Sequence, residues 1–248
     1  MDLPFDLTPA SALFMALAFA VAAFVRGYSG FGFSALVVAS SALVTNPLNF
    51  VAVVIFCEFL MTVQQWHGVW RQVDWRRVIT LMIGAVVGLP IGLWALTGVG
   101  IDVARAVVAI YVLVMCGVML MGWRLHKPQG DAGHLVAGVA SGLANAPGMG
   151  GLPVASYFTA QGMGAGVFRA TLIAYFALLD LYSAPVMWWH GMVTWDTLYA
   201  AVLSLPIIVL GTWAGGRHFL NTDPQDFRRF AIVLLAVLAV MGLAKSVL

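Results

Sequence analysis

Apolar residues occur along the chain in ten runs that are separated by short polar segments. Six runs contain about 17–22 residues, and a helix of that length crosses a hydrocarbon layer of about 30 Å. The other four runs contain only about 13–15 residues. We interpret these four as two pairs of re-entrant or broken helices. The long runs are 50–66, 78–97, 103–123, 168–189, 197–216 and 229–247, and the short ones are 11–25, 31–45, 135–147 and 149–163.

The two halves of the chain resemble each other. Three tripeptides recur in the same order, at spacings of 118, 123 and 119 positions. They are Gly30-Phe31-Gly32 with Gly148-Met149-Gly150, Trp66-His67-Gly68 with Trp189-His190-Gly191, and Gly92-Leu93-Trp94 with Gly211-Thr212-Trp213. We infer an internal duplication with residues 1–125 as the first repeat, 126–134 as a cytoplasmic linker and 135–248 as the second repeat. The alternative is a coincidence of helix composition.

The distribution of lysine and arginine indicates how the repeats are oriented. If each short pair folds as a hairpin, each repeat has five segments and most basic residues face one side of the membrane. If each pair is a single crossing, the same residues divide six to five. The positive-inside rule favours the hairpins, which predicts inverted repeats with both termini outside. In that arrangement Arg105 and Lys245 face outward and Arg26 lies at a hairpin tip, while the cytoplasmic set is Arg71, Arg76, Arg77, Arg124, Lys127, Arg169, Arg217, Arg228 and Arg229.

Composition supports the membrane interpretation. Hydrophobic residues make up 62% of the chain and charged residues only 9%, whereas about a quarter of a soluble domain is charged. We therefore expect an all-α polytopic protein of the cell inner membrane, in contact with the lipid bilayer and not with nucleic acid. The first nine residues carry Asp2 and Asp6 but no basic residue, so we expect no cleaved signal peptide. The two cysteines lie alone, and we expect neither a metal site nor a cofactor.

Each short pair is interrupted by a glycine-rich segment. Glycine permits a left-handed backbone and a close approach of ligand to main chain. The helix that follows each break presents unpaired N–H groups and the positive end of its dipole, so two such helix starts facing each other would form an anion site. The alternative is that the glycines only allow helices to pack closely. The predicted substrate-binding residues are Arg26, Gly27, Tyr28, Ser29, Gly30, Phe31, Gly32, Asn145, Pro147, Gly148, Met149, Gly150 and Gly151.

Three charged residues in apolar segments are candidates for a role in the mechanism. Arg26 could be a counter-charge for an anionic substrate, or it could extend to a lipid headgroup or pair with an acid. At the spacing of the glycine match its counterpart is Ala144, so the site would be asymmetric. Glu58 and Asp180 occupy nearly equivalent places and are candidates for proton coupling, because burial favours a neutral carboxyl group. Alternatively, both are structural partners of buried donors.

The sequence contains no pattern typical of a common enzyme class. There is no His-Glu-x-x-His, no Gly-x-Ser-x-Gly and no phosphate-binding loop. We therefore expect that the protein is not an enzyme.

The glycine motifs resemble those of the sulfite exporter TauE/SafE family of membrane permeases. The resemblance depends on residues 27–32, on Gly142 and on residues 147–151, and the duplicated halves extend it over essentially the whole chain. It implies transport of small sulfur-containing anions such as sulfite or short organosulfonates. Met149 stands where the family more often has isoleucine. We expect an exporter that works by alternating access, with protons as a candidate coupling ion and a homo-oligomer as one possible assembly; the alternative is a passive anion channel.

Overall fold

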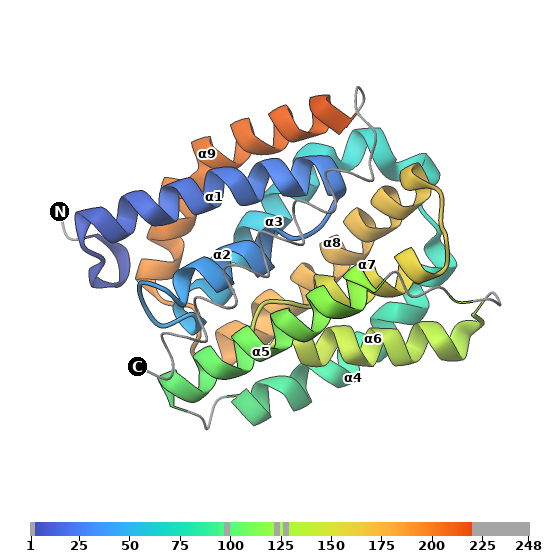
Figure 1. Cartoon of the computed structure of the whole chain (residues 1–248), viewed down its shortest axis with the longest axis horizontal. Coiled ribbons are helices and arrows are strands. Elements are labelled where there is room, and N and C mark those ends of the chain that lie inside the picture. The colour runs from blue at the N-terminus through green and yellow to red at the C-terminus, as the bar shows by residue number, and fades with distance from the viewer. Residues whose placement is uncertain (1–2, 97–99, 122–124, 126–128, 220–248) are drawn as a thin grey trace.

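The computed structural model describes residues 3–96, 100–121, 125 and 129–219. Within those residues every regular element is helical, which confirms the all-α fold class for this part of the chain (Figure 1). The predicted run 229–247 lies outside the described residues. The elements are η1 (Pro4–Asp6), α1 (Pro9–Ser29), α2 (Phe33–Ser41), α3 (Leu48–Val69), η2 (Trp70–Gln72), α4 (Trp75–Leu96), α5 (Ile101–Leu120), α6 (Asp131–Asn145), α7 (Gly151–Ala160), α8 (Ala165–Trp189) and α9 (Trp195–Phe219).

Five helices in the described part, namely α1, α3, α4, α8 and α9, are long and apolar enough to cross a membrane. Their outer faces carry large apolar side chains that would be unfavourable in water. Leu17 of α1 is 61% exposed, Trp94 of α4 80% and Leu210 of α9 65%. Such surfaces are stable when lipid covers them, so the chain is a multi-pass membrane protein.

Both predicted interruptions are present. Helix α2 turns back along α1, and α7 turns back along α6 (Figure 1). Helix α2 has 9 residues, α7 has 10 and α6 has 15, so all three are shorter than a full crossing. Helix α6 begins at Asp131, inside the segment that the sequence assigned to a linker.

The expectation of a short first segment is wrong. Helix α1 has 21 residues and is long enough to span the bilayer, whereas the sequence predicted a run of only 11–25. At its start the Thr8 side chain accepts a hydrogen bond from the N–H of Ser11. Pro9 occupies the first turn, where backbone N–H groups have no partner within the helix, so the N–H that proline lacks is not needed there. At its end the helix continues through Arg26 and Gly27, and Gly27 lies against the backbone of Thr212 on α9.

Glycine residues bring α4 and α6 into backbone contact. The contact advances in the same direction along both helices, from Gly84 beside Leu135 to Gly92 beside Leu143, so the two helices run parallel. A Cβ atom at either glycine would overlap a backbone carbonyl of α6. Small residues allow this close approach, which is a main source of helix association in lipid.

A second parallel pair, α1 with α9, is built in the same way. Gly211 lies beside Ala20, and four residues later Gly215 lies beside Phe24. Each parallel pair therefore combines one helix from the first half of the chain with one from the second half.

The helices have two common ends. In Figure 1, α1, α3 and α9 run away from the end that carries the N-terminus, and α4, α6 and α8 run back toward it. The opposite end, which we call the basic end, contains the end of α3 and the start of α4. Its cations include Arg71, Arg76, Arg77, Arg169 and Arg217.

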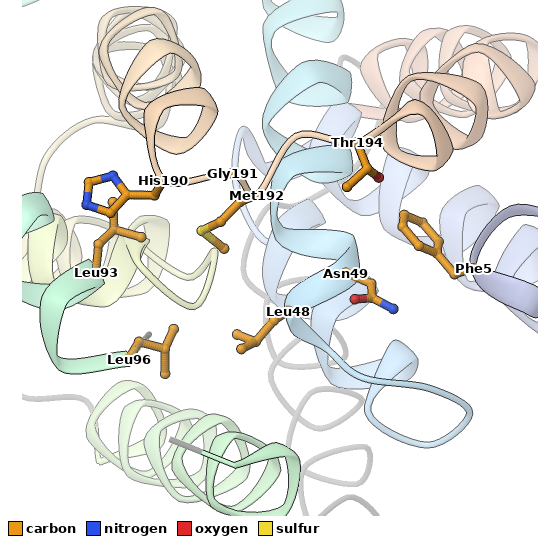
Figure 2. A pocket seen from close by; sticks show the side chains of 9 residues that line it. All are labelled: Phe5, Leu48, Asn49, Leu93, Leu96, His190, Gly191, Met192 and Thr194. Atoms are coloured by element: carbon orange, nitrogen blue, oxygen red, sulfur yellow. The ribbon is translucent and has the colours of Figure 1, made fainter. Parts of the chain in front are cut away.

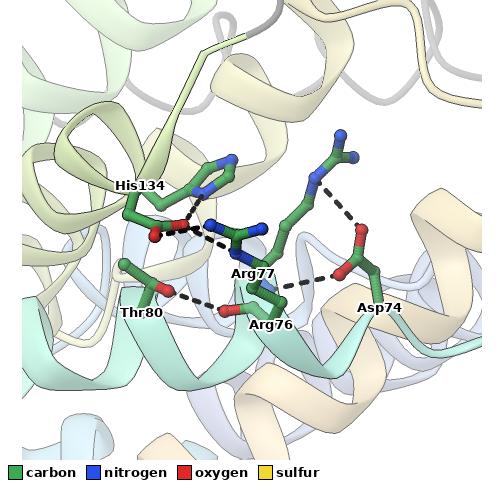
Figure 3. Close-up of polar contacts among 6 residues, drawn as sticks. Asp74, Arg76, Arg77, Thr80 and His134 are labelled. Atoms are coloured by element: carbon green, nitrogen blue, oxygen red, sulfur yellow. Dashed lines mark hydrogen bonds and ion pairs between the residues drawn. The ribbon is translucent and has the colours of Figure 1, made fainter.

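Ion pairs at the basic end join helices that are distant in sequence. Arg76 of α4 donates two hydrogen bonds to Asp131 at the start of α6, with N···O distances of 3.0 and 2.9 Å (Figure 3). These bonds lower the pKa of the Asp131 carboxyl group. Asp74 pairs with Arg77 at 3.2 Å and accepts from its backbone N–H, so it also caps the start of α4.

We predict that Gly88→Ala weakens the α4–α6 pair, because the added Cβ would overlap the carbonyl of Val139. The free energy of unfolding should fall by about 1–3 kcal/mol. Thermal unfolding in detergent, followed by size-exclusion chromatography, measures the effect. Gly117→Ala on α5 is the matched control, since nothing described lies within 4 Å of its added atom. Equal melting temperatures for the two variants would contradict the prediction.

Candidate functional site

Arg26 lies in the interior of the bundle. Its side chain is 0% exposed, although it comes from the last turn of a membrane-spanning helix. Nη1 donates to the carbonyl oxygen of Gly30 at 2.6 Å, and Nη2 donates to Oγ1 of Thr62 on α3 at 3.3 Å. The guanidinium also stacks over the ring of Phe176 on α8, 4.6 Å from its centroid. Arg26 therefore does not extend to a lipid headgroup in this structure.

Two buried acids share this interior with Arg26. Glu58 of α3 is 5% exposed and interacts electrostatically with Arg26 and with the backbone and hydroxyl of Ser34, in the first turn of α2. Asp180 of α8 is 1% exposed and interacts with Glu58 and Arg26. We call Arg26, Glu58 and Asp180 the central charge cluster.

The central charge cluster contains one cation and two acids. If both carboxyl groups were ionised, a net negative charge would be buried without a partner, which is strongly unfavourable. Asp180 Oδ2 has no hydrogen-bond partner among the described residues. A proton on either acid would remove this excess negative charge.

The first break is held by side chains of its own helix. Gly30 ends α1 with φ of 82°, and Gly32 precedes α2 with φ of 94°, conformations that suit glycine. The Ser29 hydroxyl lies 2.8 Å from the carbonyl of Val25 and accepts from the N–H of Phe31 at 3.3 Å. Ser29 thus stabilises the first break by hydrogen bonds between its hydroxyl group and the backbone on either side of it.

Tyr28 points away from the central charge cluster. Its ring lies 5.8 Å from the ring of His218 on α9, between centroids, and the side chain is buried. Among the polar side chains predicted for the first break, Arg26 faces the interior while Tyr28 faces α9.

The second break is a turn that closes on the end of α6. The N–H of Gly148 donates to the carbonyl of Asn145 at 2.9 Å, and that of Met149 donates to Ala144 at 2.8 Å. Gly148 has a left-handed backbone conformation, with φ of 75°, as is common where a helix ends. Pro147 lies within the same turn. Two of the amides in this break are therefore already bonded and unavailable to a ligand.

Asn145 makes a contact that parallels that of Arg26. Its Nδ2 donates to Ser183 Oγ on α8 at 2.8 Å, just as Arg26 donates to Thr62 on α3. Asn145, which follows the predicted counterpart Ala144, therefore makes at the second break the kind of contact that Arg26 makes at the first.

A hydrogen-bonded network beside the second break was not anticipated from the sequence. Ser141 Oγ donates to the carbonyl of Gly150 at 2.6 Å and accepts from the Tyr175 hydroxyl at 2.7 Å. Both side chains are buried. The network fixes the start of α7 against α6 and α8.

Phe176 connects the two breaks. Arg26 from the first break lies over its ring, and a Cβ at Gly151 in the second break would lie 2.8 Å from its Cζ atom. The sequence offers a weak signal for this residue, since Phe176 precedes Asp180 by one helical turn and shares its face of α8.

The second break lies beside the middle of α2. Gly148 lies beside Val38, the sixth residue of α2, and not beside the first turn of that helix. A rise of about 1.5 Å per residue separates those positions by roughly 7–8 Å along α2. The two breaks are therefore neighbours across Phe176, staggered along the bundle.

A pocket of about 350 Å³ opens at the end of the bundle that carries the N-terminus (Figure 2). It lies between the start of α3, the end of α4 and the α8–α9 loop. His190 holds a ring nitrogen, Nδ1, 2.8 Å from the Val186 carbonyl. The lining residues are Phe5, Leu48, Asn49, Leu93, Leu96, His190, Gly191, Met192 and Thr194, so the pocket is mostly apolar and separate from the central charge cluster.

Apolar helices of membrane-spanning length, two interrupted helix pairs and buried charges define a multi-pass α-helical membrane protein with charged residues in its interior. The chain belongs to the sulfite exporter TauE/SafE family, whose model matches residues 15–242. A protein of Cupriavidus necator named "Probable sulfite/organosulfonate exporter TauE" is 26% identical over 218 residues, which cover 84% of each chain. No solved structure matches the chain.

We predict that Arg26→Met destabilises the fold, because it leaves two acids buried without a cation. At pH 8 the free energy of unfolding should fall by about 3–5 kcal/mol. The loss should be smaller at pH 5, where protonation removes the negative charge. Thermal unfolding of the purified protein at both pH values measures this.

Adding Glu58→Gln to Arg26→Met should restore part of the lost stability, since it removes one of the uncompensated acids. A double variant no more stable than Arg26→Met would show that charge is not what makes Arg26 necessary.

Proposed function

We propose that the protein is a secondary transporter that exports small sulfur-containing anions, such as sulfite or short organosulfonates. The observation that carries the proposal is the fully buried Arg26, which lies beside the first break and over the ring of Phe176 in a bundle of membrane-spanning length. A buried cation in a membrane protein generally marks a substrate or ion pathway. Membership of the family and the name of the Cupriavidus necator protein support the choice of anion.

The chemistry of a sulfonate or sulfite group suits the donors around Arg26. Each group presents three acceptor oxygens. Arg26 Nε has no hydrogen-bond partner among the described residues, and the first turns of α2 and α7 supply backbone N–H groups that a helix cannot bond internally. We propose that the anion binds between residues 26–34 and 145–151, with Phe176 packed against it.

Glu58 occupies part of this site and has to be neutral when an anion binds. Its carboxyl group interacts with Ser34 at the start of α2, where an anionic substrate would also bind. Two ionised acids would repel the substrate more strongly than Arg26 alone attracts it. We infer that a proton on Glu58 or Asp180 and the anion occupy the site together.

The arrangement of the helices supports inverted repeats. Helix α1 runs parallel to α9, and α4 runs parallel to α6, as their glycine contacts require. The hairpin of α1 and α2 makes α1 and α4 antiparallel, so corresponding helices of the two halves run in opposite directions (Figure 1). Inverted repeats with broken helices are a common plan of transporters that expose one site alternately to each side.

The basic end is proposed to face the cytoplasm of the cell inner membrane, which places the N-terminus outside. A C-terminus on the outside and a homo-oligomer remain predictions, and the predicted last segment lies outside the described residues.

We predict that a proton gradient that drives protons in the same direction as the anion accelerates wild-type uptake of labelled sulfite or short sulfonates into proteoliposomes. Glu58→Gln should remove this dependence, because the amide mimics the permanently protonated acid, and Asp180→Asn tests the second acid in the same way. Asp196→Asn changes an exposed acid and should behave as the wild type. An unchanged gradient dependence in both Glu58→Gln and Asp180→Asn would eliminate these acids as coupling groups, and flux that does not saturate would indicate a passive channel.

We predict that Gly30→Ala and Gly148→Ala each reduce flux at least about tenfold, because both glycines shape a break through a left-handed backbone. Gly162→Ala is the matched control, since Gly162 has φ of +66° but no described atom within 4 Å of its added Cβ. Initial rates in proteoliposomes, at equal protein content, measure the effect. Equal losses in all three variants would assign the effect to backbone strain alone.

A further inference from the structure

Arg169 of α8 reaches the first break from the other half of the chain. Its Nη2 donates to the carbonyl oxygen of Gly27 at 2.8 Å. The Cγ atom of its stem lies 3.0 Å from the place of a Cβ at Gly30. The sequence assigned Arg169 only to the set of cytoplasmic topology signals; the structure keeps it at the basic end and adds its contact with the first break.

Two valines pack against Gly148 in the second break, and Cγ2 of Val38 on α2 lies 3.3 Å from the place of a Cβ there. The other, on α3, is Val51. Its Cγ1 atom lies 3.4 Å from the place of a Cβ at Gly148. Gly30 and Gly148 are 118 positions apart, and so are Val51 and Arg169. The same place beside the left-handed glycine is thus occupied by a cation at the first break and by a buried apolar side chain at the second.

Within this staggered arrangement the first break lies nearer the basic end and the second nearer the end that carries the N-terminus. Arg169 is the fifth residue of α8, which starts at the basic end, and α1 finishes its last turn beside it. Val51 is the fourth residue of α3, which starts at the end carrying the N-terminus. The arginine therefore marks one end of the proposed substrate path.

Arg26 and Arg169 both donate to carbonyls of the first break and repel each other electrostatically. An anion bound between the two guanidinium groups reduces this repulsion and is attracted by both of them. Guanidinium groups also match the oxygens of sulfur oxyanions through paired donors.

We propose that Arg169 is an anion-capture residue that loads substrate from the basic end and passes it to Arg26. This inference rests on the proposed function. At the opposite end the corresponding side chain is Val51 and the pocket is mostly apolar, so the anion binds there more weakly and is released. This difference in affinity sets the anion concentration at which the site fills from each side. The energy for net transport comes from the gradients of the anion and of any coupled ion across the membrane.

The test compares the KM for labelled sulfite or a short sulfonate from each side, in proteoliposomes whose protein orientation is read by protease cleavage of a terminal tag. Arg169→Met should raise the KM from the basic end by about ten- to hundredfold, the worth of a charge-assisted hydrogen bond. The KM from the other end should change by less than about twofold.

Two further variants keep the test decisive. Arg169→Lys retains the charge and the stem beside Gly30, and should raise the same KM by a smaller factor than Arg169→Met; it also serves if the methionine variant does not fold. Arg71→Gln removes an exposed cation at the same end and should leave both KM values unchanged.

An equal rise from both sides, or no rise from either, would overturn the capture role while leaving the proposed transport intact. A wild-type protein without saturable anion flux would overturn the proposed function and this inference with it.

Discussion

The burial of one guanidinium group constrains the rest of the interior. Arg26 cannot be stable away from water unless acceptors, an aromatic face and negative charge surround it. The break after α1 provides a carbonyl, α3 provides Thr62, and α8 provides Phe176. Three helices, α1, α3 and α8, are therefore arranged around this positive charge, and the acids on α3 and α8 lie within its field.

Lipid also requires that each interrupted helix satisfy its own backbone. In the first break Arg26 and Ser29 bond to carbonyl and amide groups that the helix releases, and in the second break Gly148 and Met149 donate back to α6. Few backbone groups remain for a ligand, which makes the first turns of α2 and α7 the important ones. The proposed site is accordingly limited to the backbone N–H groups of those two first turns and does not include the other amides of the breaks.

Periodicity predicted the helical elements and the two interruptions, because segment length reflects the thickness of the membrane, whereas the inverted repeats that charge indicated stay a prediction. The length of α1 was missed because Arg26 and Gly27 look locally like the end of an apolar run, although Gly27 is packed against α9 within the helix. The predicted site included Arg26 and Asn145 but not Phe176, Ser141, Tyr175 or Arg169. Those four are ordinary residues of helices, and only the tertiary arrangement brings them to the breaks.

The parallel pairs α1–α9 and α4–α6 have a consequence for any conformational change. Each pair is locked by backbone contact along several turns and joins helices from different halves of the sequence. Any rearrangement that keeps these contacts therefore moves helices of both halves together, and neither half of the chain can then move as a rigid body by itself. For the same reason, two fragments produced by cutting the chain between its halves would each expose a glycine-lined strip of backbone, and each would need the other to cover it.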